Sequence, residues 1–341
     1  MRVPVESTKQ ATMVDVAQRA GVSYQTVSRV INGHPSVAPR TRERVLRAID
    51  ELNYLPNAAA RNLVTRRSRT VGIISYGTTY FGPGQMLANI ETSFRERDYG
   101  LTLSTLTEMS LGALHAAIHE LRGRAVDGIV MITPLANIDS DEIRKLCRNV
   151  PFVMIDVALG QSVPSVVIDQ RQGGILATRH LLALGHREIA EIRGPADWSG
   201  AALRHEGMLA VLHEAGLEPV MSVEGDWSAA SGYVAAGRLL DAGVPFSGLF
   251  ASNDQMALGA IRALRERGLG VPDDVSVVGF DDLPESAFFE PPLTTVHQDF
   301  VSLGRESAAY LSDLIDQRPT PRRQHVLDPE LVVRRSTRHW G

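Results

Sequence analysis

Hydrophobic residues near the start of the chain recur with the period of a helix in three short stretches. The stretches are MVDVAQRA (residues 13–20), YQTVSRVI (24–31) and TRERVLRAIDELNY (41–54). The first stops at Gly21, a residue type that favours the left-handed turn at a helix end, and Ser23 can cap the start of the second. The pattern predicts a three-helix unit over residues 12–55, which is too small to be an enzyme.

The pattern changes at Val71, where short apolar runs begin to alternate with longer helical stretches. The runs are VGIIS, LTLSTL, DGIVMIT, PFVMID, SVVID, EIAEIRG, GLFASND, VSVVGFDD and LTTVHQD. This alternation predicts parallel strands joined by helical crossovers, and there are enough runs for two sheets. We therefore expect an N-terminal all-α helix-turn-helix headpiece, followed over residues 71–341 by an α/β core of two doubly wound parallel-sheet subdomains. Residues 56–70, in which alanines precede a basic stretch, form the predicted hinge helix and linker.

The charge is divided unevenly between these two parts. Residues 1–69 contain 12 Lys and Arg against 5 Asp and Glu, whereas the remainder contains 23 against 34. The division favours a basic module that binds a polyanion, joined to a larger acidic module. A solvated basic face with no partner would give the same count.

The composition limits the class of protein further. With 341 residues, 44% of them hydrophobic, the chain can bury a large core. The single cysteine, Cys147, excludes an internal disulfide and a cysteine-rich metal site, and we expect neither a metal nor a cofactor. No apolar run is long enough to cross a bilayer and no apolar leader follows the first residues, so we expect a cytoplasmic protein.

The second predicted helix has a polar face suited to reading DNA. Its valines can anchor it on the first helix, so that Tyr24, Gln25 and Arg29 enter a major groove, where Gln can pair with adenine and Arg with guanine. Phosphate contacts, which fix the register of the protein on the duplex, are expected from the neighbouring polar residues. These are Thr12, Ser23, Ser28 and Asn32. The alternative is an ordinary helical hairpin with a solvated face.

Polar side chains follow four of the apolar runs at the points where the runs end. They are Asp156, Asn253, Asp281 and Gln298. Because ligands of open α/β sheets bind beyond the carboxyl ends of the strands, we expect these side chains to meet in one cleft. Arg204 adds a planar donor, and Trp227 or Phe300 can cover the apolar face of a pyranose. The set predicts a sugar site, although singly Asn253 could cap a helix and Trp227 could lie in the core.

Motifs of the common enzyme classes do not appear in the chain. FGPGQML lacks the third glycine of a dinucleotide-binding loop, and no phosphate-binding GxxxxGK[ST], HExxH or GxSxG motif occurs. The adjacent carboxylates of Asp281 and Asp282 should diverge, so they cannot face each other across a scissile bond. We therefore expect a binding protein rather than an enzyme. A secreted sugar-binding protein would account for the core but not for the headpiece.

In combination the motifs resemble those of the lactose-repressor (LacI/GalR) family. The resemblance rests on TMVDVAQRAGVSYQTVSRVINGHPSVAPRTRERVLRAIDELNYLPNAAARNL, LLALGHREIA, EGDWSAASGY, ASNDQMALGAIRAL, VSVVGFDD and PPLTTVHQDF. It covers nearly the whole chain and leaves residues 1–11 as an added, disordered tail. It implies a transcriptional repressor that binds a palindromic operator as a dimer, with a core like the periplasmic sugar-binding proteins.

The resemblance also assigns a role to the hinge. PNAAARNLV is similar to the segment that folds into a helix when two headpieces meet on DNA, with Leu63 as an apolar wedge in the minor groove. It adds Tyr54 and Asn57 to the expected DNA contacts. The alternative is a flexible linker whose leucine packs on the core. Since the chain ends at Trp340-Gly341, without the C-terminal heptads of a tetrameric family member, we expect a dimer rather than a tetramer.

For the core, the resemblance implies a small-molecule sugar effector that releases the operator. The positions that match the family's effector contacts are Asp156, Arg204, Trp227, Asn253, Asp281, Gln298 and Phe300. The agreement favours a galactoside. Tyr76 and Gly200, however, replace small hydroxyl residues of the family pattern and alter one wall, which leaves a β-glucoside, another oligosaccharide or a non-sugar metabolite as alternatives.

Overall fold

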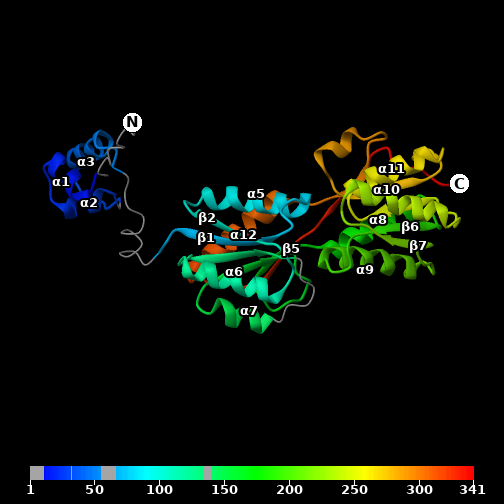
Figure 1. Ribbon diagram of the computed structural model, residues 1–341, viewed down its shortest axis with the longest axis horizontal. Helices are drawn as coiled ribbons and strands as arrows, with labels where there is room; N and C mark the ends of the chain where they lie inside the picture. The colour runs from blue at the N-terminus through cyan, green and yellow to red at the C-terminus, as the bar shows by residue number, and fades with distance from the viewer. Residues whose placement is uncertain (1–10, 32, 55–66, 134–139) are drawn as a thin grey trace, which may run out of the picture. The chain divides into compact units, whose positions relative to one another are not determined.

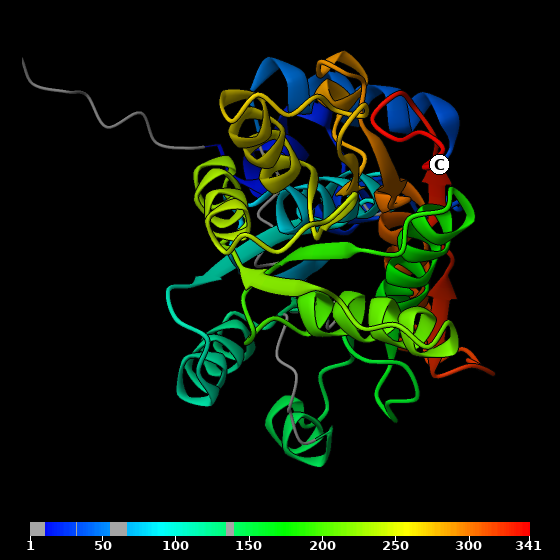
Figure 2. The same cartoon turned by 90° about the vertical axis from the view of Figure 1, so that its right-hand side faces the viewer.

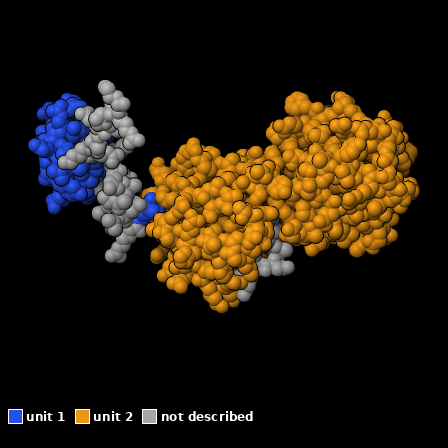
Figure 3. All heavy atoms as spheres, viewed as in Figure 1, with its two compact units in different colours: residues 1–68 blue, residues 69–341 orange. Residues whose placement is uncertain are grey.

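The computed structural model describes four ranges of the chain: 11–31, 33–54, 67–133 and 140–341. The chain divides into two compact units, Met1–Ser68 and Arg69–Gly341, which are coloured separately in Figure 3. The expected disordered tail, apart from Ala11, and most of the expected hinge lie outside the described residues.

The described part of the first unit contains three helices. They are α1 (Met13–Ala20), α2 (Tyr24–Ile31) and α3 (Pro39–Glu51). Thr12 and Asp15 form a capping box at the start of α1, and Gly21 ends that helix with a φ of 62°. Helix α3 starts earlier than predicted because the fixed φ of Pro39 suits a first helical turn. It also ends earlier, since Asn53 has a φ of 46° that no α-helix continues through.

The second unit consists of two subdomains, each built on a sheet with six described strands. The N-terminal subdomain has the strand order β11-β5-β4-β3-β1-β2, paired in parallel. Its strands are β1 (Thr70–Tyr76), β2 (Gly100–Leu106), β3 (Gly128–Ile132), β4 (Phe152–Ile155), β5 (Ser165–Ile168) and β11 (Gln324–Leu327). Its helices are α5 (Phe81–Arg95), α6 (Leu111–Gly123), α7 (Ser140–Cys147) and α12 (Phe300–Ile315). Helices α5 and α12 cover one face of the sheet, and α6 and α7 cover the other (Figure 1).

The C-terminal subdomain repeats this plan with the strand order β12-β10-β9-β8-β6-β7. Its strands are β6 (Ile189–Arg193), β7 (Met221–Glu224), β8 (Gly248–Ala251), β9 (Ser276–Asp281), β10 (Thr294–His297) and β12 (Glu330–Val332). Its helices are α8 (Gln170–Ala183), α9 (Ser199–Glu214), α10 (Ala229–Asp241), α11 (Asp254–Glu266) and the 3-10 helix η1 (Pro284–Phe288). Helices α10 and α11 lie on one face of the sheet and α8 and α9 on the other (Figures 1 and 2).

Coverage on both faces explains why the strands appear in the sequence as continuous apolar runs. In β8, Leu249 and Ala251 pack in the cluster beneath α10 and α11, while Phe250 packs beneath α8 and α9. Successive side chains of a strand point to opposite faces, so both sets must be apolar when helices cover both sides. The predicted fold class is confirmed.

The chain crosses between the two subdomains three times in its described part. The crossings lie between β5 and α8, between β10 and α12, and between β11 and β12. Each subdomain is therefore completed by segments that are distant in sequence.

Three strands were not among the predicted runs. They are β7, β11 and β12, each at the edge of a sheet, and β12 pairs antiparallel with β10. An edge strand is covered on fewer sides, so its residues can be polar, as in QHVL of β11. The apolar pattern used to find the other strands is consequently weak here.

Candidate DNA-reading surface and effector cleft

Helix α2 presents a polar face away from the core of the headpiece. Val27 and Val30 are buried among residues of α1 and α3, whereas Tyr24, Gln25 and Arg29 are exposed. The exposed residues occupy the first two turns of the helix, which is the part of a recognition helix that meets base edges. The predicted division of this helix into an anchoring face and a polar face is present in the structure.

Two of the residues expected to contact phosphates cap helices. The Ser23 hydroxyl accepts the backbone N–H of Thr26 at 3.2 Å, and the Thr12 hydroxyl lies 2.6 Å from the Asp15 carboxylate. Both hydroxyls therefore stand at helix N-termini, where exposed N–H groups also favour an anion. Ser28 is half-buried on α2.

The remaining predicted DNA contacts are placed differently or not described. Tyr54 packs in the headpiece core and is only 6% exposed. Asn32, Asn57 and Leu63 lie outside the described residues, so their contacts with DNA stay predictions.

Six of the seven predicted effector residues line one cavity at the carboxyl ends of the strands. They are Asp156, Arg204, Trp227, Asn253, Asp281 and Gln298. Asp156 comes from the N-terminal subdomain, and the strands β8 and β9 supply residues from the C-terminal subdomain. The cavity therefore lies between the two subdomains.

The seventh residue, Phe300, is not among the residues that line this cavity. It begins α12 and is buried in the core of the N-terminal subdomain, with its ring centroid 6.0 Å from that of Phe81. Phe81 does line the cavity. Phe300 therefore supports the cavity wall from behind.

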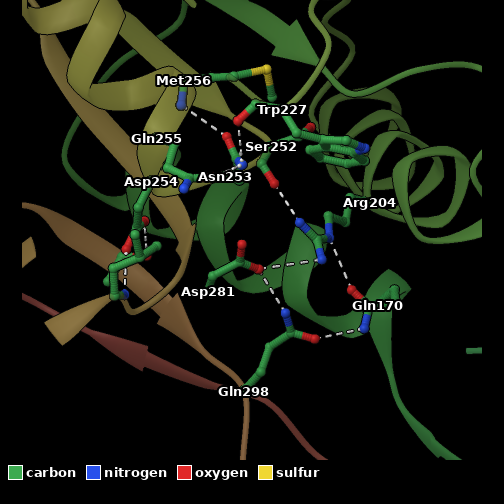
Figure 4. Close-up of polar contacts among 12 residues, drawn as sticks. Gln170, Arg204, Trp227, Ser252, Asn253, Asp254, Gln255, Met256, Asp281 and Gln298 are labelled. Atoms are coloured by element: carbon green, nitrogen blue, oxygen red, sulfur yellow. Dashed lines mark hydrogen bonds and ion pairs between the residues drawn. The ribbon is translucent and has the colours of Figure 1, made fainter. Parts of the chain in front are cut away.

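Three hydrogen bonds and one ion pair form a closed ring among the polar side chains of the cavity (Figure 4). Arg204 donates from Nε to Oε1 of Gln170 at 2.9 Å, and Gln170 donates from Nε2 to Oε1 of Gln298 at 2.7 Å. Gln298 donates from Nε2 to Oδ1 of Asp281 at 2.7 Å, and the same oxygen lies 3.5 Å from Nη2 of Arg204. Arg204 also donates from Nη1 to the Ser252 carbonyl. The side chains best suited to bind hydroxyl groups thus satisfy one another in this arrangement.

Asn253 caps a helix and also lines the cavity, so it combines the two roles considered from the sequence. Its Oδ1 accepts the N–H of Met256 at 2.8 Å and caps α11, while its Nδ2 donates to the Trp227 carbonyl at 3.0 Å. Trp227 is packed in the core of its subdomain and its indole Nε1, although buried, has no hydrogen-bond partner among the described residues. The Asn253 side chain that caps α11 therefore also holds the loop that carries Trp227.

Burial dominates the electrostatics of the cleft. It raises the pKa of Asp281 to about 6, against the opposing effects of Arg204 and of the hydrogen bond from Gln298. It also raises the pKa of Asp156 and lowers that of Arg204, despite the attraction between their charges. Displacing the water from charged groups at this depth costs more than their mutual attraction returns.

Three residues of the cavity have backbone conformations that side chains rarely adopt. Asp156, Trp227 and Asp281 have φ values of 62°, 74° and 103°. Such conformations are costly for residues with a Cβ and are concentrated at functional sites. The next residue, Asp282, turns away and bonds to His297 and Arg334, so the two carboxylates diverge as predicted.

Several lining residues were not among the predicted ones. They are Tyr80, Phe81, Gly82, Pro83, Met86, Gln170 and Trp198. Gln170 and the residues from Tyr80 onward follow strand ends, so the rule that located Asp156 could have found them too. Trp198 precedes α9 in the loop after β6. Gly200, noted in the sequence, also lines the cavity.

Two segments of the chain match described protein families. Residues 12–57 match "Bacterial regulatory proteins, lacI family", and residues 178–337 match "Periplasmic binding protein-like domain". The chain is 38% identical to the lactose operon repressor of Escherichia coli (strain K12) over 329 residues, covering 96% of this chain and 91% of the relative. The chain belongs to the LacI family.

Other relatives and solved structures that resemble this LacI-family chain are also repressors or transcriptional regulators. A repressor named PurR, from Pasteurella multocida, is 35% identical over 96% of this chain and 99% of its own. The lac repressor dimer bound to operator and the anti-inducer ONPF superimposes with a TM-score of 0.92, at 37% identity, covering 97% of this chain and 100% of that one. A complex of the transcriptional regulator CelR with cellobiose gives 0.71, at 35% identity, over 96% and 99%.

As a LacI-family protein, the chain is a DNA-binding transcriptional repressor with a ligand-binding core. Members of the family are regulators rather than enzymes. In the described ranges, no three His, Cys, Asp or Glu side chains are grouped so that they could hold a metal. None of the described helices is long and apolar enough to cross a membrane.

Proposed function

We propose that this repressor binds a palindromic operator as a dimer in the cytoplasm and is released by a sugar, with a galactoside as the first candidate. The observation that carries the proposal is the mixed chemistry of the cavity lining. Carboxylates, amides and a guanidinium line the same cavity as the aromatic rings of Tyr80, Phe81, Trp198 and Trp227. A pyranose has hydroxyl groups at its rim and an apolar face, so it matches both kinds of group.

The dimer is supported by an exposed apolar surface on the C-terminal subdomain. Tyr233 and Val234 of α10, Leu258 of α11 and Phe288 of η1 are all exposed, Phe288 by 85%. Clustered apolar side chains of this kind mark surfaces where proteins associate. A dimer also places two headpieces on the half-sites of a palindrome, about one turn of DNA apart.

Release requires the sugar to favour one arrangement of the core over another. In the proposed mechanism the unliganded core holds two hinge segments close enough to fold on DNA, and sugar binding separates them. The wedge expected at Leu63 belongs to this mechanism. Operator affinity of a Leu63→Ala variant tests it, because a wedge that kinks DNA contributes to specific binding and a passive linker does not.

The direct experiment combines a ligand screen with operator binding. A ligand that binds only the folded core raises its melting temperature, so mono- and disaccharides can be ranked by thermal shift. The best ligand should then weaken binding to a palindromic duplex selected from a random library. If no sugar shifts the melting temperature, or if the bound sugar leaves operator affinity unchanged, the sugar assignment is wrong.

Two other effectors have specific support. The similarity to the CelR complex with cellobiose favours a β-glucoside, and the similarity to repressors named PurR favours a non-sugar metabolite such as a purine. Including cellobiose and purine bases in the same thermal-shift screen separates the three candidates. Turnover of any ligand by the purified protein would contradict the inference that the core only binds.

A further inference from the structure

A buried carboxylate pairs with a histidine beneath helix α9, outside the effector cavity. Glu191 of β6 is fully buried on the sheet face that α8 and α9 cover. Its Oε2 accepts the Nδ1–H of His205 on α9 at 2.7 Å and the hydroxyl of Ser222 on β7 at 2.5 Å. Its Oε1 has no hydrogen-bond partner among the described residues. His205 is thus the basic side chain that can balance the charge of this carboxylate.

The pair joins β6 to the half of α9 that has few apolar anchors. Met208 and Leu212 hold the second half of the helix in the apolar core. The buried residues before Met208 are small or polar, and they are Ser199, Gly200, Ala201, Arg204 and Gly207. The hydrogen bond from His205 to Glu191 therefore links the first half of α9 to the sheet where apolar contacts are few.

The residue before His205 carries the guanidinium of the cavity. Arg204 and His205 are neighbours on α9, so a movement of this turn displaces both side chains. Arg204 donates to Gln170 at 2.9 Å and lies 3.5 Å from Asp281 (Figure 4). Such contacts weaken steeply when their distance or angle changes. The orientation of the guanidinium therefore depends on where Glu191 holds this turn of the helix.

His205 can exchange a proton with water, whereas Glu191 cannot. The His205 side chain is 25% exposed and the Glu191 side chain is 0% exposed. The hydrogen bond to Glu191 raises the pKa of His205 above 6.5, although burial opposes this effect. A charge-assisted hydrogen bond is stronger than a neutral one, so the pair is strongest while His205 is protonated.

Other charged groups lie on each element around this imidazole. They are Arg193 on β6, Glu224 on β7, Glu206 on α9, and Arg171 and Arg179 on α8. Arg193 lowers the pKa of His205 and Glu206 raises it. Arg193 also pairs with Glu224 at 3.2 Å, and the two arginines of α8 are exposed. Among the described residues, Glu191 is the one that forms an ion pair with His205.

We propose that the Glu191–His205 pair positions Arg204 and thereby makes effector binding weaker as the pH rises. The proposal rests on the proposed function, in which Arg204 binds the effector. Protonated His205 draws the first turns of α9 onto β6 and holds the guanidinium at Gln170 and Asp281. This positioning is fully present below pH 6.5 and is lost as the pH rises through the raised pKa of His205.

The first experiment observes Arg204 directly and needs no ligand. NMR of the full-length protein with isotope-labelled arginine and histidine follows the Nε–H of Arg204, assigned by its absence in Arg204→Lys, and the ring of His205. We expect both signals to titrate with one midpoint above pH 6.5. A second step near pH 6, from Asp281, should remain in His205→Asn while the first disappears. Glu191→Gln removes the charge and should lower the shared midpoint.

His213 provides the matched control for this titration. It lies on the same helix and pairs with Glu218 at 3.0 Å, but the two side chains are 53% and 73% exposed. His213→Asn should leave the titration of Arg204 unchanged. An Arg204 signal that does not follow His205, or an equal effect of His213→Asn, would overturn the proposal. Should His205→Asn not fold, the midpoint of Arg204 in Glu191→Gln decides it.

The second experiment measures the effect on binding. Lactose and cellobiose are the probes, titrated by calorimetry at pH values on either side of the measured His205 midpoint. We expect the wild type to lose about fivefold in affinity, the difference between a charge-assisted and a neutral hydrogen bond, and His205→Asn to lose less. Equal losses would show that His205 does not act on the cavity. If neither sugar binds the wild type, the galactoside and β-glucoside assignments fail, and the Arg204 titration still decides the positioning.

Discussion

The Gln170 side chain donates a 2.7 Å hydrogen bond to Gln298, and the two residues lie on different connections between the subdomains. Gln170 starts α8, just after the first crossing, and Gln298 lies in the second crossing. The other end of the Gln170 amide accepts the Nε–H of Arg204 at 2.9 Å. A change in the angle between the subdomains therefore acts directly on the guanidinium of the cleft.

Replacing Gln170 by methionine tests the contribution of this amide. Gln170→Met keeps the length of the side chain but leaves the buried Nε of Arg204 and Oε1 of Gln298 without these partners. We expect the free energy of unfolding to fall by about 1–3 kcal/mol, the cost of leaving a buried polar group unsatisfied. Urea denaturation of the wild type and the variant measures this difference in the free energy of unfolding. The same exchange at the exposed Gln317 should change stability by less than about 0.5 kcal/mol, and equal losses at both positions would contradict the role given to Gln170.

Asp281 should make the stability of the core depend on pH. Its pKa is raised from 3.8 to about 6, so between these values the folded protein binds a proton that the unfolded chain does not. The stabilisation is fully present below pH 3.8 and is lost as the pH rises through about 6. Asp281→Asn keeps an oxygen for Gln298 and cannot titrate. Urea denaturation of the variant across this window should show a smaller decline with rising pH than the wild type, and identical slopes would exclude Asp281 as the cause.

Helices α8 and α9 touch through their backbones near the cleft. A Cβ at Gly174 would lie 2.1 Å from the Arg204 carbonyl oxygen, a distance no structure tolerates. Gly174→Ala should therefore separate the helices, lower the free energy of unfolding by about 1–3 kcal/mol and weaken effector binding by displacing Arg204. Gly237→Ala in α10 is the control, because its Cβ would meet no atom within 4 Å. Thermal melts of both variants should show a loss only for Gly174→Ala.

Gln25 and Arg29 should determine which sequence is bound rather than how strongly DNA is held. Both are exposed on α2 while the valines of this helix anchor it. We expect Gln25→Ala and Arg29→Ala each to cost about 1–3 kcal/mol on the operator, with most binding to random DNA retained. Competition gel shifts with operator and scrambled duplexes measure the two affinities. A loss of the same size on both duplexes would show that these residues contact only the backbone.

Leu258 tests the proposed dimer surface. It is exposed on α11 beside exposed residues of α10, so Leu258→Arg places a charge within an apolar contact. We expect a monomer by sedimentation and a loss of operator affinity, with ligand binding by the core preserved. Val301→Arg, at an apolar residue of α12 that is 65% exposed against 41% for Leu258, is the matched control. A Leu258→Arg protein that stays dimeric would place the interface elsewhere.

The fold was predictable because its dominant signal is local. Helix α2 has the period of a helix with two buried valines, and strands such as β8 are apolar on both faces, so each element shows its type in its own residues. The edge strands β7, β11 and β12 were not predicted from the sequence because their pairing is decided by a distant segment. QHVL of β11 becomes a strand through its register with β5, far away in the sequence.

The cavity was predictable where strand topology alone places a residue. Asp156 and Asp281 follow strand ends, and the carboxyl ends of parallel strands point into one cleft. The contact of Tyr80 with Trp198 depends instead on how the two subdomains face each other. No local sequence pattern predicts that arrangement. Phe300 was expected in the cleft, yet it packs behind Phe81 because the first turn of α12 directs it into the core.

The interleaved path of the chain has a consequence for its synthesis. Strand β11 pairs with β5 at the edge of the first sheet, and β12 pairs with β10 at the edge of the second, only a few residues later. Neither sheet can close while the ribosome still holds residues 324–332. A nascent chain stalled just before this point would display two incomplete sheet edges at once, and both subdomains would mature together once residues 324–332 have left the ribosome.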